Sequence, residues 1–549
     1  MMEPVGALMT SPKSMQRSIN NKHINDKCIN DEWICDALLL EINQSPAETL
    51  QATLYRGIRT LIEEGRITAG IRLPSTRRLV ARLPIGRNTA MLVMEQLAHD
   101  GFVEARAGAG CFVSHAYTAR GRIDKHEIPN VHVNEPDSVH QEGMPINAEG
   151  ANERLSARGE RLLDLSQLRN HSGALAFSPG LPSLSLFPWE KWRRLQQRHW
   201  RRMPMDWMRY HTEGGLLRLR EVLCDYLTLS RSVRCTPNQI VITQGAQQAF
   251  SLIATLLAEE GETVWFENPG YRGARAAFEA ANLTVEPVPV DNEGIAPHAD
   301  LPTPSLIYIT PSHQYPTAVT LSMSRRMALL EKAEQSGAWI IEDDYDSEFR
   351  YDARPLASLQ GIDTAERVIY VGTFSKVMYP GLGLGYMVLP ASLADAFRRA
   401  STRLMREIHY PLQAAVADFI ADGAFRQHIR RCRRAYEERQ SLLRRCLQPA
   451  VERGLRLSPG KAGMHLLATH AEGLDEAALI ERGRVHNVHL SPYSSYFMAA
   501  SNPQDLETHP DPASSKNTTG LVLGYAAAGG QALEQASYLL NQWLEQTGR

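Results

Sequence analysis

The stretch Thr373-Phe374-Ser375-Lys376 decides the fold of the large C-terminal part of this chain. It follows an apolar run at residues 367–372, RVIYVG, which predicts a buried β-strand. A glycine-rich stretch, Gly381 to Gly385, comes just after it and leads into a second apolar run. An amine directly after a buried strand is partly desolvated, which lowers its pKa and exposes its lone pair. Lys376 is therefore a candidate for Schiff-base chemistry with a carbonyl compound.

A second strand pattern, residues 339–346 (WIIEDDYD), ends in a cluster of acids. An acid at the carboxyl end of a parallel strand faces the usual ligand crevice of an α/β sheet. Pyridoxal 5'-phosphate (PLP) needs both a lysine and a carboxylate against its pyridinium nitrogen. We predict that Asp343 provides this carboxylate, that Tyr345 reaches the ring hydroxyl, and that Lys376 forms the aldimine. The alternative for the acids is a solvated loop.

A phosphate site is predicted where residues 240–243, a strand pattern, lead through a glycine into a helix pattern. The free backbone amides at a helix N-terminus attract phosphate. Tyr271, in an Asn-Pro-Gly-Tyr turn, is predicted to stack on the pyridine ring. The predicted phosphate contacts are the backbone groups of Gly245, Ala246 and Gln247 and the hydroxyls of Thr373 and Ser375.

Residues 47–115 predict three helices and a β-hairpin, a winged helix-turn-helix. Residues 48–115 hold nine arginines and no lysine against six acidic residues, although the whole chain has a net charge of −2. This local excess suits contact with double-stranded DNA. Base and phosphate contacts are expected from the start of the third helix, from the helix before it and from the wing. The predicted DNA-binding residues are Arg87, Asn88, Thr89, Arg77, Arg106 and Gly108.

The remaining segments divide the 549 residues into parts. Residues 1–46 are polar and predict a mobile tail, although Trp33 to Ile42 has the character of one short helix. Residues 116–172 predict a linker, and residues 501–519 predict a surface insertion in a domain that covers 173–549. Seven scattered cysteines without a Cys-x-x-Cys pair predict reduced thiols in the cytoplasm and no metal site. No run is apolar enough for a membrane span.

Residues 173–549 resemble the fold-type-I aminotransferases, and with the N-terminal segment most of the chain resembles the MocR subfamily of GntR transcriptional regulators. The match rests on four motifs, residues 341–349 (IEDDYDSEF), 372–376 (GTFSK), 267–271 (ENPGY) and 310–316 (TPSHQYP). The resemblance implies an α/β PLP-dependent transferase fold behind a winged helix-turn-helix. It also implies a homodimer in which Tyr210 reaches the partner subunit's cofactor.

Four positions depart from these family patterns. Gly86 stands where GntR domains usually carry a serine, so a capping hydroxyl worth about 1 kcal/mol is missing. Gly383 replaces the arginine that holds the phosphate in MocR proteins, and Ala318 replaces the glycine of a Pro-Thr-Gly turn. The late strand at residues 520–524, GLVLG, lacks the arginine that binds the substrate carboxylate in aminotransferases.

Two functions compete on this basis. The first is a DNA-binding regulator whose aminotransferase-like domain binds PLP and senses PLP itself or an amine or amino acid. The second is a working aminotransferase with a DNA-binding appendage, which the missing carboxylate-binding arginine disfavours. A regulator with a decayed PLP site is a third possibility, against which the intact Lys376, Asp343 and Tyr271 argue.

Overall fold

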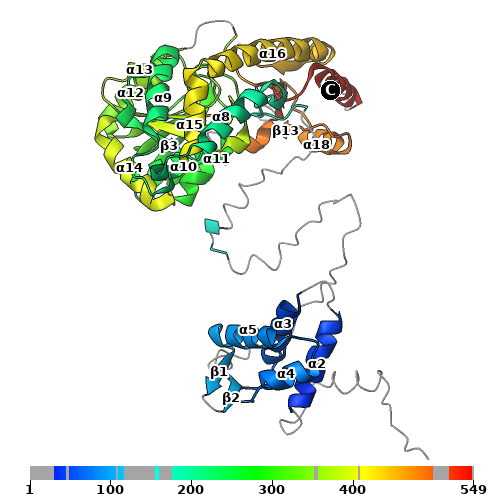
Figure 1. Cartoon of the computed structure of the whole chain (residues 1–549). Coiled ribbons are helices and arrows are strands. Elements are labelled where there is room, and N and C mark those ends of the chain that lie inside the picture. The colour runs from blue at the N-terminus through cyan, green and yellow to red at the C-terminus, as the bar shows by residue number, and fades with distance from the viewer. Residues whose placement is uncertain are drawn as a thin grey trace, which may run out of the picture. The chain divides into compact units, whose positions relative to one another are not determined.

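The computed structural model describes residues 30–44, 49–106, 109–115, 155–156, 158–159, 176–351, 356–405, 409–460, 462–498 and 519–546. Two compact units, Met1–Gly143 and Met144–Arg549, make up the chain and are described one at a time (Figure 1). The predicted linker falls almost entirely outside the described residues, as do residues 501–518 of the predicted insertion and Gly108 of the predicted wing.

The first unit is a winged helix-turn-helix, as predicted. Its β-hairpin is antiparallel, with Val103 opposite Val113. The Ser75 hydroxyl caps the second of the three predicted helices by accepting a hydrogen bond from the backbone nitrogen of Arg78 at 3.4 Å. Gly86 precedes the third predicted helix and provides no side chain to cap it, also as predicted. The elements are α2 (Asp31–Gln44), α3 (Leu50–Glu63), α4 (Thr76–Arg82), α5 (Arg87–His99), β1 (Val103–Arg106) and β2 (Gly110–Val113).

The short helix expected from Trp33 to Ile42 is present as α2, but it is packed into this unit, so the mobile tail predicted for residues 1–46 was wrong for this helix. Ile34, Leu38 and Ile42 recur every four residues, so they lie on one face of the helix. All three side chains are buried in the same hydrophobic core as α3 and α5. Gly57 of α3 allows this packing, since a Cβ atom there would lie 2.9 Å from Cδ2 of Leu38. Helix α2 is therefore part of the core of this unit.

The second unit is built on an eight-stranded sheet with the order β3-β10-β9-β8-β7-β4-β5-β6. Neighbours from β9 through β5 in this order are parallel, whereas β10 is antiparallel to both β3 and β9. Parallel central strands need cover on both faces, and the apolar runs of β7 and β9 are buried accordingly. The strands are β3 (Ile240–Thr243), β4 (Thr263–Asn268), β5 (Thr284–Asp291), β6 (Gly294–Ile295), β7 (Leu306–Ile309), β8 (Trp339–Asp344), β9 (Val368–Thr373) and β10 (Gly385–Val388).

Helices separate most of these strands, and two more precede the first of them. The longest, α16 (Ala424–Cys446), leads from the large sheet to the C-terminal part of the unit. The others are α8 (Trp189–Arg201), α9 (Leu217–Arg231), α10 (Ala246–Leu257), α11 (Arg272–Ala280), α12 (Met323–Ser336), α13 (Leu359–Ile362), α14 (Ala391–Met405) and α15 (Tyr410–Ala421). Short 3₁₀ turns are η4 (Leu184–Leu186), η5 (Met205–Met208), η6 (Pro237–Gln239), η7 (Pro380–Leu382) and η8 (Tyr493–Tyr496).

A smaller antiparallel sheet, ordered β11-β12-β14-β13, closes the C-terminal part of the unit. One hydrophobic core joins this sheet to residues of β3, β9 and β10, so both sheets belong to one packed body. The elements are α17 (Gln448–Glu452), β11 (Leu455–Leu457), β12 (His465–His470), α18 (Glu476–Val485), β13 (Ser491–Pro492), β14 (Gly520–Gly524) and α20 (Gly530–Gln546). Among the described residues, no helix has both the length and the apolar character needed to cross a bilayer.

Candidate functional sites

The start of α5 presents the predicted DNA-binding side chains to solvent. Arg87 and Asn88 are exposed in the first turn of this helix, and Thr89 is partly buried beside them. Arg77 is exposed in the first turn of α4. Arg106 ends β1 with its guanidinium 4.6 Å from the centre of the Phe112 ring. The first-turn amides of α5 receive no side-chain cap, which leaves them available to an anion.

The second site is formed where β8 and β9 end at the same edge of the large sheet. These strands are parallel neighbours, with Asp343 opposite Val371. Asp343 is the second-to-last residue of β8, and Lys376 follows the end of β9 by three residues. Burial lowers the pKa of the Lys376 amine, and the negative charges of Asp343 and Asp346 oppose this effect. The structure thus brings together the two residues on which the cofactor prediction depends.

Asp343 is a buried carboxylate with one oxygen satisfied and one without a partner. Its Oδ2 accepts a 2.6 Å hydrogen bond from the Tyr308 hydroxyl. Its Oδ1 is buried and has no hydrogen-bond partner among the described residues. Burial raises the pKa of Asp343 to about 7, and the Tyr308 hydrogen bond and the Lys376 charge partly offset the rise. A cationic N–H donor at Oδ1 would satisfy the free oxygen and restore the ionised form.

The predicted phosphate residues lie at this same edge of the sheet. Gly385 of β10 is opposite both Thr373 and Thr243, so the ends of β3 and β9 are aligned. A Cβ atom on Gly385 would lie 2.8 Å from the carbonyl carbon of Gly245, so the backbone of β10 approaches the start of α10 closely. Gly245 has a φ of +82° and open space where a side chain would be. Two further hydrogen bonds lie at this edge. Gln247 Nε2 donates to the Gly273 carbonyl at 2.8 Å, and the backbone nitrogen of Ser375 donates to Thr373 Oγ1 at 3.2 Å.

The three predicted tyrosines are placed differently. Tyr271 contacts Tyr315 edge to face with ring centres 5.9 Å apart, and the negative charge of Asp343 adds to the burial that raises its pKa to about 12. The Tyr345 hydroxyl donates a 3.0 Å hydrogen bond to the His313 carbonyl. Tyr210 is 82% exposed.

Three residues of the site were not identified from the sequence. Tyr308 holds Asp343, and the only signal for it is a single aromatic hydroxyl within the aliphatic strand β7. Gly180 has a φ of +69°, and a Cβ atom there would lie 3.0 Å from Lys376 Nζ, so it makes room for the lysine. His313, within a motif used for the family match, contacts Tyr345 and Asp346.

The departures from the family patterns have structural consequences. Gly383 ends η7 with a φ of +60° and open space around it, so no side chain extends from this position. Ala318 has a φ of +65°, a left-handed conformation that glycine adopts at lower cost. All five residues of β14 are buried, and none is an arginine.

The aminotransferase class I and II family profile matches residues 180–502, and the profile of bacterial regulatory proteins of the gntR family matches residues 50–113. The probable rhizopine catabolism regulatory protein MocR of Rhizobium meliloti is 35% identical over 492 residues, which cover 89% of this chain and 92% of that protein. This chain belongs to the MocR subfamily of GntR transcriptional regulators. Another MocR-type relative is the pyridoxine biosynthesis regulator PdxR of Corynebacterium glutamicum, 29% identical over 81% of this chain and 89% of its own length.

Solved aminotransferases share the fold of the second unit of this MocR-type regulator. LysN, the α-aminoadipate aminotransferase of Thermus thermophilus, is 26% identical with a TM-score of 0.59, over 72% of this chain and 97% of its own. Its structure was solved with N-(5'-phosphopyridoxyl)-L-leucine. Pyrococcus horikoshii kynurenine aminotransferase, at 24% identity and a TM-score of 0.60, matches in fold over 74% of this chain and 98% of its own. The predicted subfamily and fold class are confirmed.

The pH dependence of stability should reveal the buried carboxylic acid. The pKa of Asp343 is raised from 3.8 to about 7 in the folded chain, so the folded state holds a proton that the unfolded state releases between these values. In cofactor-free protein, this group should lower the free energy of unfolding as pH rises from about 4 to 7, by up to about 1.4 kcal/mol per pH unit. We expect Asp343→Asn to flatten the slope in urea denaturation followed by tryptophan fluorescence.

Two features make this measurement specific. Seven of the eight tryptophans belong to the second unit, so the fluorescence follows mainly that unit. Buried Glu267, whose pKa is also raised to about 7, should keep part of the slope in the variant. Asp300→Asn, at an exposed position, is the control. An unchanged slope in Asp343→Asn would show that this carboxyl is ionised in the folded protein.

Proposed function

We propose that this MocR-type regulator binds PLP at Lys376 and that PLP, or an amine or amino acid reacting with it, changes its binding to a double-stranded DNA operator. The carrying observation is the free Oδ1 of buried Asp343 at the sheet edge that also holds Lys376. PLP, when bound, supplies an aldehyde that reacts with amines and a pyridinium ring that accepts electrons.

Each residue of the site has a distinct task in this proposal. Asp343, held by Tyr308, keeps the pyridinium nitrogen protonated, which requires its own ionised form. Lys376, whose pKa is lowered by burial, supplies the amine that reacts at the aldehyde carbon. Tyr345 binds the ring hydroxyl, and Tyr271 covers the ring. The phosphate is held by the start of α10, Gly245, Ala246 and Gln247, with the hydroxyls of Thr373 and Ser375.

A homodimer is part of the proposal. Tyr210 is 82% exposed, and the neighbouring Met205 and Met208 of η5 are 74% and 60% exposed. Large apolar side chains gathered on one short segment suit burial against another chain. Tyr210 would then act at the cofactor of the partner subunit. PLP could regulate DNA binding only if it binds the DNA-competent and incompetent states of the dimer unequally.

The alternative function, a working aminotransferase, has less support. The relatives include the 2-aminoadipate transaminase of Thermus thermophilus, 29% identical over 61% of this chain. An α-amino acid substrate needs a cation for its carboxylate, and β14 offers none. We therefore favour sensing over turnover.

Loading with PLP should alter the DNA footprint through Lys376. Genomic fragments selected by the purified full chain would be footprinted with and without PLP. Borohydride reduction, which makes the lysine–cofactor bond permanent, should attach PLP to the Lys376 peptide in mass spectrometry. Lys376→Ala should lose both the attachment and the PLP-dependent change, whereas Lys332→Ala, on α12, should keep both. Absence of attached PLP would reject the cofactor, and attachment without a change in the footprint would reject the sensor.

Removing the guanidinium of Arg87 should weaken operator binding by about 1–3 kcal/mol, because this exposed side chain lies at the end of α5 that enters the major groove. Fluorescence anisotropy with a selected fragment measures the Kd of Arg87→Ala. Arg59→Ala is the control, since the Arg59 guanidinium is already bound to Glu63 at 2.7 Å. Equal affinity of Arg87→Ala and the unmodified chain would remove α5 from the DNA interface.

An arginine at position 383 should strengthen PLP binding. A charged contact to phosphate contributes about 1.5–3 kcal/mol, and the left-handed backbone of Gly383 costs a larger residue about 1 kcal/mol. We expect a roughly 10-fold lower Kd for PLP in Gly383→Arg by equilibrium titration. Gly383→Ala, which bears the backbone cost alone, should bind no better than the unmodified chain. If the two variants bind alike, position 383 does not face the phosphate.

A further inference from the structure

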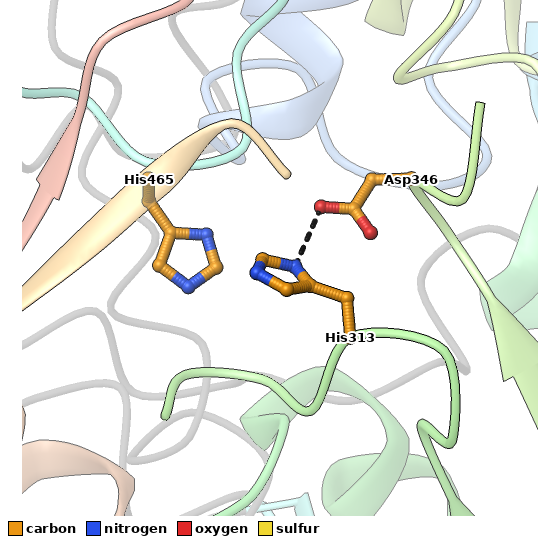
Figure 2. A group of neighbouring side chains, drawn as sticks. All are labelled: His313, Asp346 and His465. Carbon is orange, nitrogen blue, oxygen red and sulfur yellow. Dashed lines mark hydrogen bonds and ion pairs between the residues drawn. The ribbon is translucent and has the colours of Figure 1, made fainter. Parts of the chain in front are cut away.

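Two histidines and an aspartate from three distant segments meet in the interior of the second unit (Figure 2). His313 is in the loop after β7, Asp346 follows β8, and His465 begins β12 of the smaller sheet. Their side chains are nearly inaccessible, with exposures of 3%, 1% and 1%. One potential ligand atom of each lies within 4.8 Å of those of the other two. His313 and Asp346 lie beside the proposed cofactor site, but none of the three residues has been given a role in binding PLP or DNA.

The hydrogen bonds of His313 fix which ring nitrogen carries the proton. The Tyr345 hydroxyl donates its single proton to the His313 carbonyl. Its oxygen can therefore only accept from His313 Nδ1, which lies 2.9 Å away, and the Asp346 carboxylate accepts from the same nitrogen at 3.0 Å. Nδ1 therefore carries a proton, and in the neutral imidazole the lone pair is on Nε2. Nε2 is buried without a hydrogen-bond partner in the described structure, and Figure 2 shows this nitrogen on the side of the ring that faces His465.

His465 has the complementary arrangement. Its Nε2 lies 3.1 Å from the Pro316 carbonyl oxygen, which can only accept, so Nε2 carries the proton. Its Nδ1 therefore has the lone pair, and this nitrogen too is buried with no partner among the described residues.

Between two neutral rings, neither of these nitrogens can donate to the other, and a buried acceptor without a partner costs about 1–3 kcal/mol. One electron-pair acceptor placed between the two lone pairs, a metal ion, would satisfy both. Metal-binding histidines typically donate the N–H of their other ring nitrogen to a carboxylate or a backbone carbonyl. His313 donates to the Asp346 carboxylate, and His465 donates to the Pro316 carbonyl. Two imidazoles on one tetrahedral zinc ion, with Zn–N bonds of about 2.0–2.1 Å, have ring centres about 5 Å apart. The observed separation is 5.1 Å.

We propose that His313 Nε2 and His465 Nδ1 bind a divalent transition-metal ion of the zinc type. Asp346 orients His313 and is near enough to become a third ligand after a shift of its side chain, since tetrahedral ligand atoms are about 3.3 Å apart. Water or a small ligand completes the coordination. The ion joins the loop after β7 to the smaller sheet, and through His313 it contacts Tyr345. This metal site is independent of the proposed binding of PLP and DNA.

Cobalt(II) is the probe, because its visible ligand-field absorption reports coordination by nitrogen and oxygen. The full chain, dialysed against a chelator, would be titrated with Co²⁺ and then with Zn²⁺. We expect saturation at one ion per chain, displacement of the band by Zn²⁺, and a higher thermal transition with Zn²⁺. His465→Gln should lose the band and the thermal shift, and His313→Gln should do the same.

Matched measurements keep the test decisive. His486→Gln changes an exposed histidine of the same unit and should keep the band. Circular dichroism identifies any variant that has not folded, and the other histidine variant then decides. The proposal is overturned if the unmodified chain shows no saturable band, which would leave water as the shared donor. It is also overturned if a folded His465→Gln keeps the band or if His486→Gln loses it, since the ion then binds at the surface.

Discussion

The parallel pairing of β8 with β9 is the constraint on which the second unit depends. It places an acid and an amine, Asp343 and Lys376, at one buried edge, where each charge lowers the cost of burying the other. The compensation is incomplete, because burial still raises the pKa of the acid and lowers that of the amine. The edge therefore favours a ligand that offers a cationic N–H to the acid and a carbonyl to the amine, which is the basis of the proposal that PLP binds here.

The parts of this arrangement that are local in sequence were predictable. An apolar run that ends in acids specifies both a strand and the end at which its polar residues emerge, which is why the sequence could place Asp343 and Lys376 at the ends of strands, where the structure has them. The same holds for α4, whose start is set by the Ser75 cap. In each case the signal lies within a few residues of the feature that it specifies.

The parts that depend on tertiary contacts were not predictable. The apolar face of α2 is visible in the sequence, but its burial depends on Gly57 of another helix, whose missing side chain admits Leu38. Tyr308 and Gly180 act on Asp343 and Lys376 from other segments. His313 and His465 lie far apart in the chain, and only the packing of the smaller sheet against the loop after β7 brings their rings together. No spacing rule connects such residues.

Gly86 has a consequence for how the DNA-binding unit meets its target. Without a hydroxyl at this position, the first turn of α5 keeps backbone donors that its N-cap residue does not satisfy. In a DNA complex, a phosphate oxygen can occupy that place, so the nucleic acid itself completes the helix terminus. The first turn of α5 would then become fully ordered only in the DNA complex. The conformational entropy that it loses would therefore reduce the free energy of DNA binding and not the stability of the fold.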